Sequence, residues 1–189
     1  MPITVAPVAA MSDDALGDTV GGSSYEVFGV DAARFDRSVY VTVRTNFPAA
    51  EVGRGGDLRL VVGGTVYGLA VNTHSIANNG QVVAGDLYRG ATFRGGTVVS
   101  SVPTFIDTYA SRISGRSAVT VVRTPDRPWS YEIQARVDLA GFPGYQPGDT
   151  VLAGWSMYCG NDTDDVVIEP EEETDIALTT ARFNGQRLE

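Results

Sequence analysis

The sequence predicts an all-β protein: one antiparallel β-sandwich, with jelly-roll connectivity ahead of other all-β arrangements and at most one short helix. Three observations lead to this fold class. About ten short segments alternate between apolar and other side chains, turn residues separate them, and valine and threonine are frequent within them. The 189 residues include 22 Gly and 9 Pro, as expected for short strands joined by tight turns. We expect residues 1–23 to form an extended arm or linker and residues 24–189 a single sandwich domain.

The N-terminal arm carries a short apolar segment that contains Ile3, Val5 and Val8. Pro2 and Pro7 exclude a central strand there, because proline lacks the backbone donor that an interior ladder needs. An edge strand or an extended arm is therefore predicted. Two alternatives stay open. The arm packs on its own domain, or it adds a strand to a neighbouring copy and so builds a homo-oligomer or filament.

Two strands are predicted directly after the arm. Tyr25–Val30 alternates, and Ser38–Thr45 is one of the clearest strands in the chain, with its three valines on one face. Between them, Asp31–Asp36 is expected to form a short turn, with Asp31 as the cap of a single helical turn.

A β-hairpin is predicted around Gly63-Gly64, which separates the strand-like runs Asp57–Val62 and Thr65–Val71. A two-residue primed turn requires positive φ, and glycine adopts positive φ readily. Further along, Val82–Tyr88 is expected to form another strand. Pro103–Ala110 is the segment expected to form the short helix, with its large apolar side chains on one side.

The last third of the chain contains three further predicted strands, Ala118–Arg123, Trp129–Asp138 and Thr150–Tyr158. The third of these begins the densest block of large side chains, and we expect it to be the last central strand. It ends in Gly160–Asp162, a sequence that terminates a strand and presents polar oxygens. A short strand at Ile176–Thr179 is expected to close the chain.

Composition excludes several classes of function. The net charge of −9 argues against nucleic acid and anionic membranes as partners. No apolar run is long enough to cross a bilayer, so membrane insertion is not expected, and the N-terminus lacks the features of a signal peptide. The single cysteine, Cys159, cannot form an internal disulfide and does not indicate the compartment.

No catalytic motif is found, and the chain is not expected to be an enzyme. Walker, Rossmann and Gly-x-Ser-x-Gly patterns are absent. The only histidine, His74, lies in a polar loop without a second histidine, so an exposed polar role is expected rather than catalysis. Cys159 lacks the cationic neighbours that lower a thiol pKa and is expected in the core.

Clusters of oxygen donors are the feature that most resembles a site. Asp57 and Asp86 each follow a glycine at a strand start, and Asn161, Asp162 and Asp164 follow a strand end. Calcium takes six to eight oxygen ligands, and this set predicts a calcium site at a corner of the sandwich. The alternative is that these residues serve only as turn formers. The last cluster also lacks the complete EF-hand pattern.

Aromatic side chains indicate a second possible site. Alternation places Trp129 and Tyr131 on one face, and these two residues are the predicted ligand-binding pair of a sugar-stacking platform. Tyr145, Trp155 and Tyr158 are further members of that platform. The alternative is core packing, which we favour for tryptophan in a sandwich.

Five segments occur in an order that resembles a known bacterial domain: Tyr25–Val30, Val39–Pro48, Gly56–Leu58, Tyr67–Leu69 and Trp155–Asp162. This domain is found in exported surface proteins of cyanobacteria and other bacteria, including proteins with exosortase-type (PEP-CTERM-like) sorting tails. The most specific element is Cys-Gly-Asn-Asp after a Trp-containing strand. The resemblance implies an extracytoplasmic β-rich domain without known enzymatic activity. The chain departs from the pattern at its end, where residues 169–189 hold neither a Pro-Glu-Pro motif nor an apolar helix.

Two functions follow as expectations. The first is a non-catalytic extracellular surface or matrix domain, an adhesion or assembly module that calcium stiffens and that self-associates through Ile3, Val5 and Val8 of the arm. The alternative is a carbohydrate-binding or carbohydrate-active module that contacts a glycan through Trp129 and Tyr131.

Overall fold

The computed structural model describes residues 8–12, 26–35, 37–47, 55–76, 80–96, 102–146, 148–157 and 163–169. Within these residues the helical structure is one 3₁₀ turn at Leu139–Gly141. The strands of the described part are β1 (Val8–Met11), β2 (Val27–Phe35), β3 (Ser38–Thr45), β4 (Leu58–Val62), β5 (Thr65–Leu69), β6 (His74–Ser75), β7 (Gln81–Val82), β8 (Leu87–Arg89), β9 (Thr92–Gly95), β10 (Pro103–Thr108), β11 (Ser111–Ile113), β12 (Ser117–Arg123), β13 (Tyr131–Asp138), β14 (Val151–Ser156) and β15 (Thr163–Ile168).

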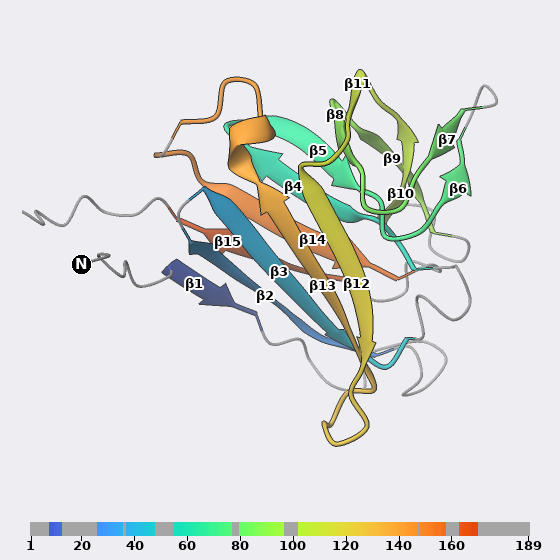
Figure 1. The fold of residues 1–189 in the computed structure, drawn as a ribbon. Coiled ribbons are helices and arrows are strands. Elements are labelled where there is room, and N and C mark those ends of the chain that lie inside the picture. Colours follow the sequence, from blue (N-terminus) through green and yellow to red (C-terminus); the bar gives the residue numbers. More distant parts are fainter. Residues whose placement is uncertain are drawn as a thin grey trace, which may run out of the picture.

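Two antiparallel sheets form the sandwich (Figure 1). A five-stranded sheet has the order β1-β2-β3-β13-β12, and a six-stranded sheet has the order β11-β8-β5-β4-β14-β15. The prediction of an all-β antiparallel sandwich is confirmed. Strand β3 pairs with β13 in one sheet while β4 pairs with β14 in the other. The connections β3–β4 and β13–β14 therefore cross the sandwich side by side, as in a jelly roll.

The core lies between the two sheets because alternate residues of each strand point inward. In β13, Ile133, Ala135 and Val137 are buried while Gln134 and Arg136 between them are exposed. The opposite sheet contributes Trp155, which is only 2% exposed and is among the largest fully buried side chains. Its indole Nε1 donates to the backbone oxygen of Gly56 at 2.8 Å, so its polar atom is satisfied inside the core.

Beside the six-stranded sheet lie two small sheets, β10-β9 and β6-β7 (Figure 1). They cover a separate cluster of buried residues that includes Val82, Tyr88 and Ile106. Gly68 lies beneath this cluster, and a Cβ there would stand 2.6 Å from Ile106 Cγ1. Only glycine leaves room for this contact between β5 and β10.

The helix predicted at Pro103–Ala110 is wrong, because this segment forms strand β10. Its backbone groups are bonded at both ends to other parts of the chain. Asp57 N donates to Thr104 O at 2.8 Å, and Ile106 N donates to the Asp57 carboxylate at 2.9 Å. Pairing with β9 extends the segment further. Tertiary hydrogen bonds thus decide a sequence whose local pattern was ambiguous.

Two other predicted boundaries are wrong. Asp31–Asp36 forms no helical turn, since β2 continues to Phe35 and pairs with β3 down to Ser38. Val82–Tyr88 is not one strand, because a turn at Gly85, with φ of 83°, separates β7 from β8. In both cases the partner strand sets the limit of pairing.

The Gly63-Gly64 hairpin is confirmed: β4 and β5 flank it, and the φ angles of its glycines are 53° and 75°. Strand β14 is central, as expected, because β4 and β15 pair with its two edges. In the arm, β1 pairs with β2 of the same chain, which is the packing alternative. Ile3, Val5, Cys159 and the predicted strand at Ile176–Thr179 lie outside the described residues.

Candidate functional site

The predicted metal ligands that the structure describes serve separate protein contacts. Asp57 bonds to two backbone amides and to His74, Asp86 pairs with Arg112, and Asp164 bonds to Ser12 and Val30. Among the described residues, no group of three or more His, Cys, Asp or Glu side chains is placed to hold a metal ion. Asn161 and Asp162 lie outside the described residues, so the calcium site stays a prediction.

Asp57 is a buried carboxylate that joins three segments. Its Oδ1 accepts from Val71 N at 3.1 Å, and its Oδ2 accepts from Ile106 N at 2.9 Å. The same Oδ2 lies 2.7 Å from His74 Nε2. The side chain of Asp57 has no exposed surface, so these contacts replace all of its hydration. The predicted metal ligand is instead the polar centre that ties β4 to β6 and β10.

His74 is not the exposed polar residue that the sequence indicates, since its side chain is 14% exposed. Its ring stands edge-on to Phe105, with 5.5 Å between the ring centroids. Burial alone lowers the pKa of His74, but the hydrogen bond and the negative charge of Asp57 outweigh burial, so the pKa is raised above 6.5. Nδ1 faces the backbone oxygen of Ser75 at 3.3 Å, so both ring nitrogens have acceptors and the imidazolium is favoured.

A pH dependence of stability follows from this raised pKa. The contribution of protonated His74 is fully present below the unfolded pKa of 6.5 and is lost as pH rises through the higher folded value. We expect the urea midpoint of unfolding to fall between about pH 6 and about pH 9. His74→Gln should remove this part of the dependence. An unchanged pH profile in that variant would contradict the assignment.

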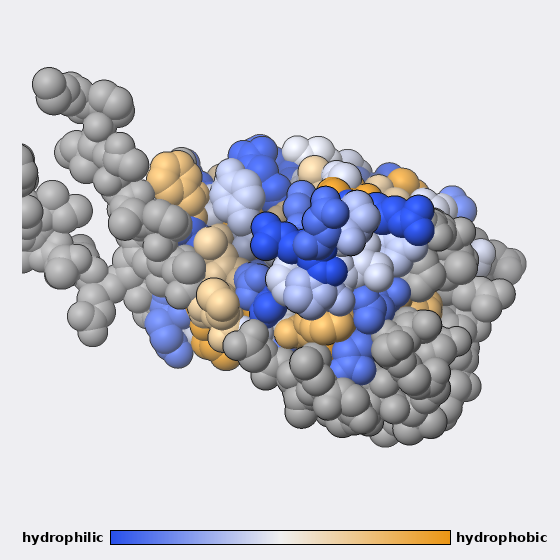
Figure 2. All heavy atoms as spheres, turned by 90° about the horizontal axis from the view of Figure 1, so that it is seen from below, coloured by the Kyte–Doolittle hydropathy of each residue, from blue (hydrophilic) through white to orange (hydrophobic). Residues whose placement is uncertain are grey.

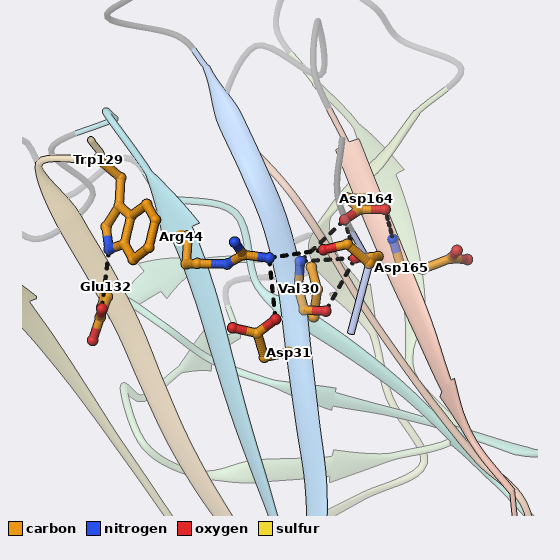
Figure 3. Close-up of polar contacts among 8 residues, drawn as sticks. Val30, Asp31, Arg44, Trp129, Glu132, Asp164 and Asp165 are labelled. Carbon is orange, nitrogen blue, oxygen red and sulfur yellow. Dashed lines mark hydrogen bonds and ion pairs between the residues drawn. The ribbon is translucent and has the colours of Figure 1, made fainter. Parts of the chain in front are cut away.

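Asp164 connects the two sheets at the edge where β15 lies against β1 and β2 (Figures 1 and 3). Its Oδ2 accepts from the hydroxyl of Ser12 and, at 3.0 Å, from the backbone of Val30. Ser12 N donates to Val30 O at 3.0 Å, so Ser12 bonds to β2 and to β15. This arrangement fastens the end of β1 to both layers and covers the edge of the six-stranded sheet.

A row of polar and aromatic side chains crosses the outer face, by which we mean the face of the five-stranded sheet turned away from the six-stranded sheet (Figure 3). Arg44 Nη2 donates to Ser12 O at 2.8 Å and to Asp31 Oδ1 at 3.1 Å. Its guanidinium carbon lies 5.3 Å from the ring centroid of Trp129, a cation–π distance. Trp129 Nε1 donates to Glu132 at 3.0 Å.

The predicted aromatic pair is divided between the two faces of the sheet. Tyr131 is 8% exposed and belongs to the buried side of β13. Trp129 precedes the strand, is half-buried and contacts Glu132 on the outer face. The expectation that the two residues share one face is therefore wrong. They form no common platform, and Trp129 is not a core residue, in contrast to Trp155.

The end of the sandwich with the β12–β13 loop has a different surface (Figure 2). Seen from this end, the described residues are mostly hydrophilic, and their hydrophobic areas are small and separate. Within this loop, Arg127 lies over the Trp129 ring at 5.9 Å from the centroid. Charged side chains therefore surround the one half-buried tryptophan of this loop.

Exposed apolar side chains gather farther along the outer face. Among the described residues, Met11, Phe35, Tyr40 and Val167 are the exposed large hydrophobics, at 70%, 44%, 43% and 41%. Three of these four lie on the outer face, because their register partners share the parity of Tyr40 and Ala33. Sequence reasoning missed this group. The available signal was Tyr40, which alternates with the valines of its strand.

Comparisons with models of protein families, with curated proteins and with solved structures return no match for this chain. In the described part of the chain, no helix has the length and apolar character needed to cross a membrane. The candidate site is therefore argued from its own geometry.

Proposed function

We propose that this chain is a non-catalytic surface or matrix domain, displayed outside the cell, that adheres to a partner protein through its outer face. The observation that supports this function is the grouping of Met11, Phe35 and Tyr40 on that face of β1, β2 and β3. Apolar surface gathered on one face of a sheet is typical of an interaction site.

The register shows how the apolar group is arranged. Tyr40 lies opposite Ala33, and Phe35 is two residues farther along the same face of β2. Tyr40 and Phe35 are thus diagonal neighbours, within reach of each other. Polar side chains border them: Asp31 pairs with Arg44 on one side. An apolar centre with a charged rim is the arrangement of protein–protein interfaces.

The extracellular location rests on the resemblance to exported surface domains over Tyr25–Asp162. The acidic balance, with a net charge of −9, agrees with a partner other than nucleic acid or an anionic membrane. Self-association through Ile3 and Val5 stays a prediction. The part of the arm that is described, β1, pairs within its own chain.

A glycan is the second candidate partner, because Trp129 lies half-buried on the outer face beside hydrogen-bonding side chains. Glu132 accepts from both Trp129 and Gln134 there. An aromatic ring next to such groups suits a sugar. Stacking on this ring would require Arg44 or Arg127 to move aside, since both lie over it. We therefore rank the glycan second.

Calcium is proposed only for the Asn161-Asp162 segment between β14 and β15. Asp57 has no exposed side-chain surface and three protein donors, which leaves it no role as a ligand. Asp86 is likewise engaged by Arg112. Asp164 would have to exchange its bonds to Ser12 and Val30 for the ion.

Retention of the labelled domain on intact cells of its source organism tests the proposal. The double variant Phe35→Ser/Tyr40→Ser should bind at least about thirtyfold more weakly, because an interface anchor is worth about 2 kcal/mol or more. Val167→Ser is the matched control: it removes an equally exposed apolar side chain from the other sheet and should bind normally.

Treatment of the cells separates the two partners. Protease should abolish binding if the partner is a protein, whereas periodate oxidation and Trp129→Ala should abolish it if the partner is a glycan. Equal retention of the wild type and of the double variant would contradict the proposed surface.

A further inference from the structure

Strand β12 forms one edge of the five-stranded sheet (Figure 1). It pairs with β13 over seven consecutive residues, from Ser117 opposite Val137 to Arg123 opposite Tyr131, without a register shift. Its other side faces no strand within the described part of the chain. This is a long and regular edge.

The hydrogen bonds at both ends of the strand show which backbone groups point outward. Thr124 N donates to Ser130 O at 2.9 Å, and Asp138 N donates to Arg116 O at 2.7 Å. In an antiparallel ladder, bonded pairs alternate with non-bonded pairs. Even-numbered residues of β12 therefore bond to β13. The odd-numbered residues direct their N–H and C=O groups away from the sheet: Ser117, Val119, Val121 and Arg123.

The other edges of the two sheets are short or covered. Strand β15 lies against β1 and β2 and is bonded to them through Asp164. Strands β1 and β11 have four and three residues. Natural sheets protect an edge with charges, proline, bulges or short length. Residues 117–122 of β12 have none of these features.

We propose that β12 is the site of homodimerisation, where it pairs antiparallel with β12 of a second copy around a two-fold axis at Thr120. This register joins Val119 to Val121 of the second copy through their outward backbone groups, and Ser117 to Arg123. Both pairs follow from the same axis, because the outward residues are symmetric about Thr120. The strand is thus complementary to itself, as a two-fold interface requires.

Side chains agree with this register. Val119 and Val121 are half-buried and pack against the core, so the second copy extends the apolar layer that they begin. Thr120 is exposed on the outer face and meets its own copy in a non-bonded pair, a favourable threonine–threonine position. Arg123 opposes Ser117, so no like charges face each other.

The dimer has a consequence for binding. The two five-stranded sheets become one continuous sheet whose outer faces point to the same side. Two copies of Met11, Phe35 and Tyr40 then face a partner together, which raises avidity. The dimer itself does not rest on the proposed function, since it depends on β12 alone.

Cysteine cross-linking in a Cys159→Ser background tests the register. Thr120→Cys places two Cα atoms about 4.5 Å apart in the non-bonded pair, within disulfide reach. Oxidation should give a covalent dimer. Gln134→Cys is the matched control, because Gln134 is the exposed neighbour of Thr120 one strand farther in. It should not cross-link.

Sedimentation of the unmodified chain gives the second measurement. A dimer of 20.0 kDa subunits is expected, and Val121→Pro should weaken it at least about tenfold, because it removes an outward donor from each copy. The β13 ladder does not use that donor, so the variant should still fold. A chain that stays monomeric at every concentration, equal cross-linking at both positions, or an oligomer unaffected by Val121→Pro would overturn the proposal.

Discussion

Replacement of Asp57 by alanine is expected to lower the free energy of unfolding by about 3–5 kcal/mol. The substitution leaves the buried N–H groups of Val71 and Ile106 without an acceptor and removes the counter-charge of His74. Each unsatisfied buried donor costs about 1–3 kcal/mol. Urea titration at about pH 6, where His74 is protonated, measures the loss.

Two further variants make this result specific. Asp57→Asn keeps an oxygen acceptor but no charge, so its loss should be smaller than that of alanine. Asp126→Ala changes an exposed aspartate in the β12–β13 turn and should leave the midpoint nearly unchanged. A loss for Asp57→Ala no larger than that for Asp126→Ala would mean that the carboxylate does not hold the three segments together.

Trp155→Ala should have a comparable effect, a loss of about 3–5 kcal/mol in the free energy of unfolding. Trp155 is 2% exposed in the middle of β14, and its removal leaves a cavity between the sheets. The backbone oxygen of Gly56 also loses its indole donor. Thermal unfolding followed by circular dichroism gives the change in midpoint.

Trp129→Ala is the natural comparison, because it removes the same side chain from the half-buried outer face. Only the contacts with Arg44, Arg127 and Glu132 are lost there, each worth about 1 kcal/mol or less at a surface. The loss should therefore be clearly smaller than for Trp155. Equal losses would show that the environments of the two tryptophans differ less than their exposure indicates.

The fold class follows from the sequence because its signal is local. Alternation of period two places Val39, Val41 and Val43 on one side of a strand in any sheet, and the structure buries all three. The Gly63-Gly64 turn likewise depends on backbone freedom at two residues, which the sequence states directly. Such features need no knowledge of the partner strand.

The errors occur where the partner decides. Pro103–Ala110 has apolar residues that suit either a helix face or a strand, and it becomes β10 because Asp57 and β9 bond to its backbone. Asp31 was assigned to a turn, yet β3 extends the pairing through it. In each case a residue distant in sequence supplies the hydrogen bonds.

The candidate site divides in the same way. Sequence alone selected Asp57 and Trp129 as residues of interest, because an aspartate at a strand start and a tryptophan in an alternating run are visible locally. It could not assign their roles. Those depend on which atoms lie within hydrogen-bond distance, such as His74 for Asp57 and Arg44 for Trp129.

The sequence by itself determined the strands, the central hairpin and the buried face of each strand, because side-chain alternation and turn chemistry are properties of neighbouring residues. Only the tertiary structure decided that Met11, Phe35 and Tyr40 gather on one face and that β12 is left as a regular edge. Strand order and register, which join residues far apart in the chain, set both features, and no local pattern encodes them.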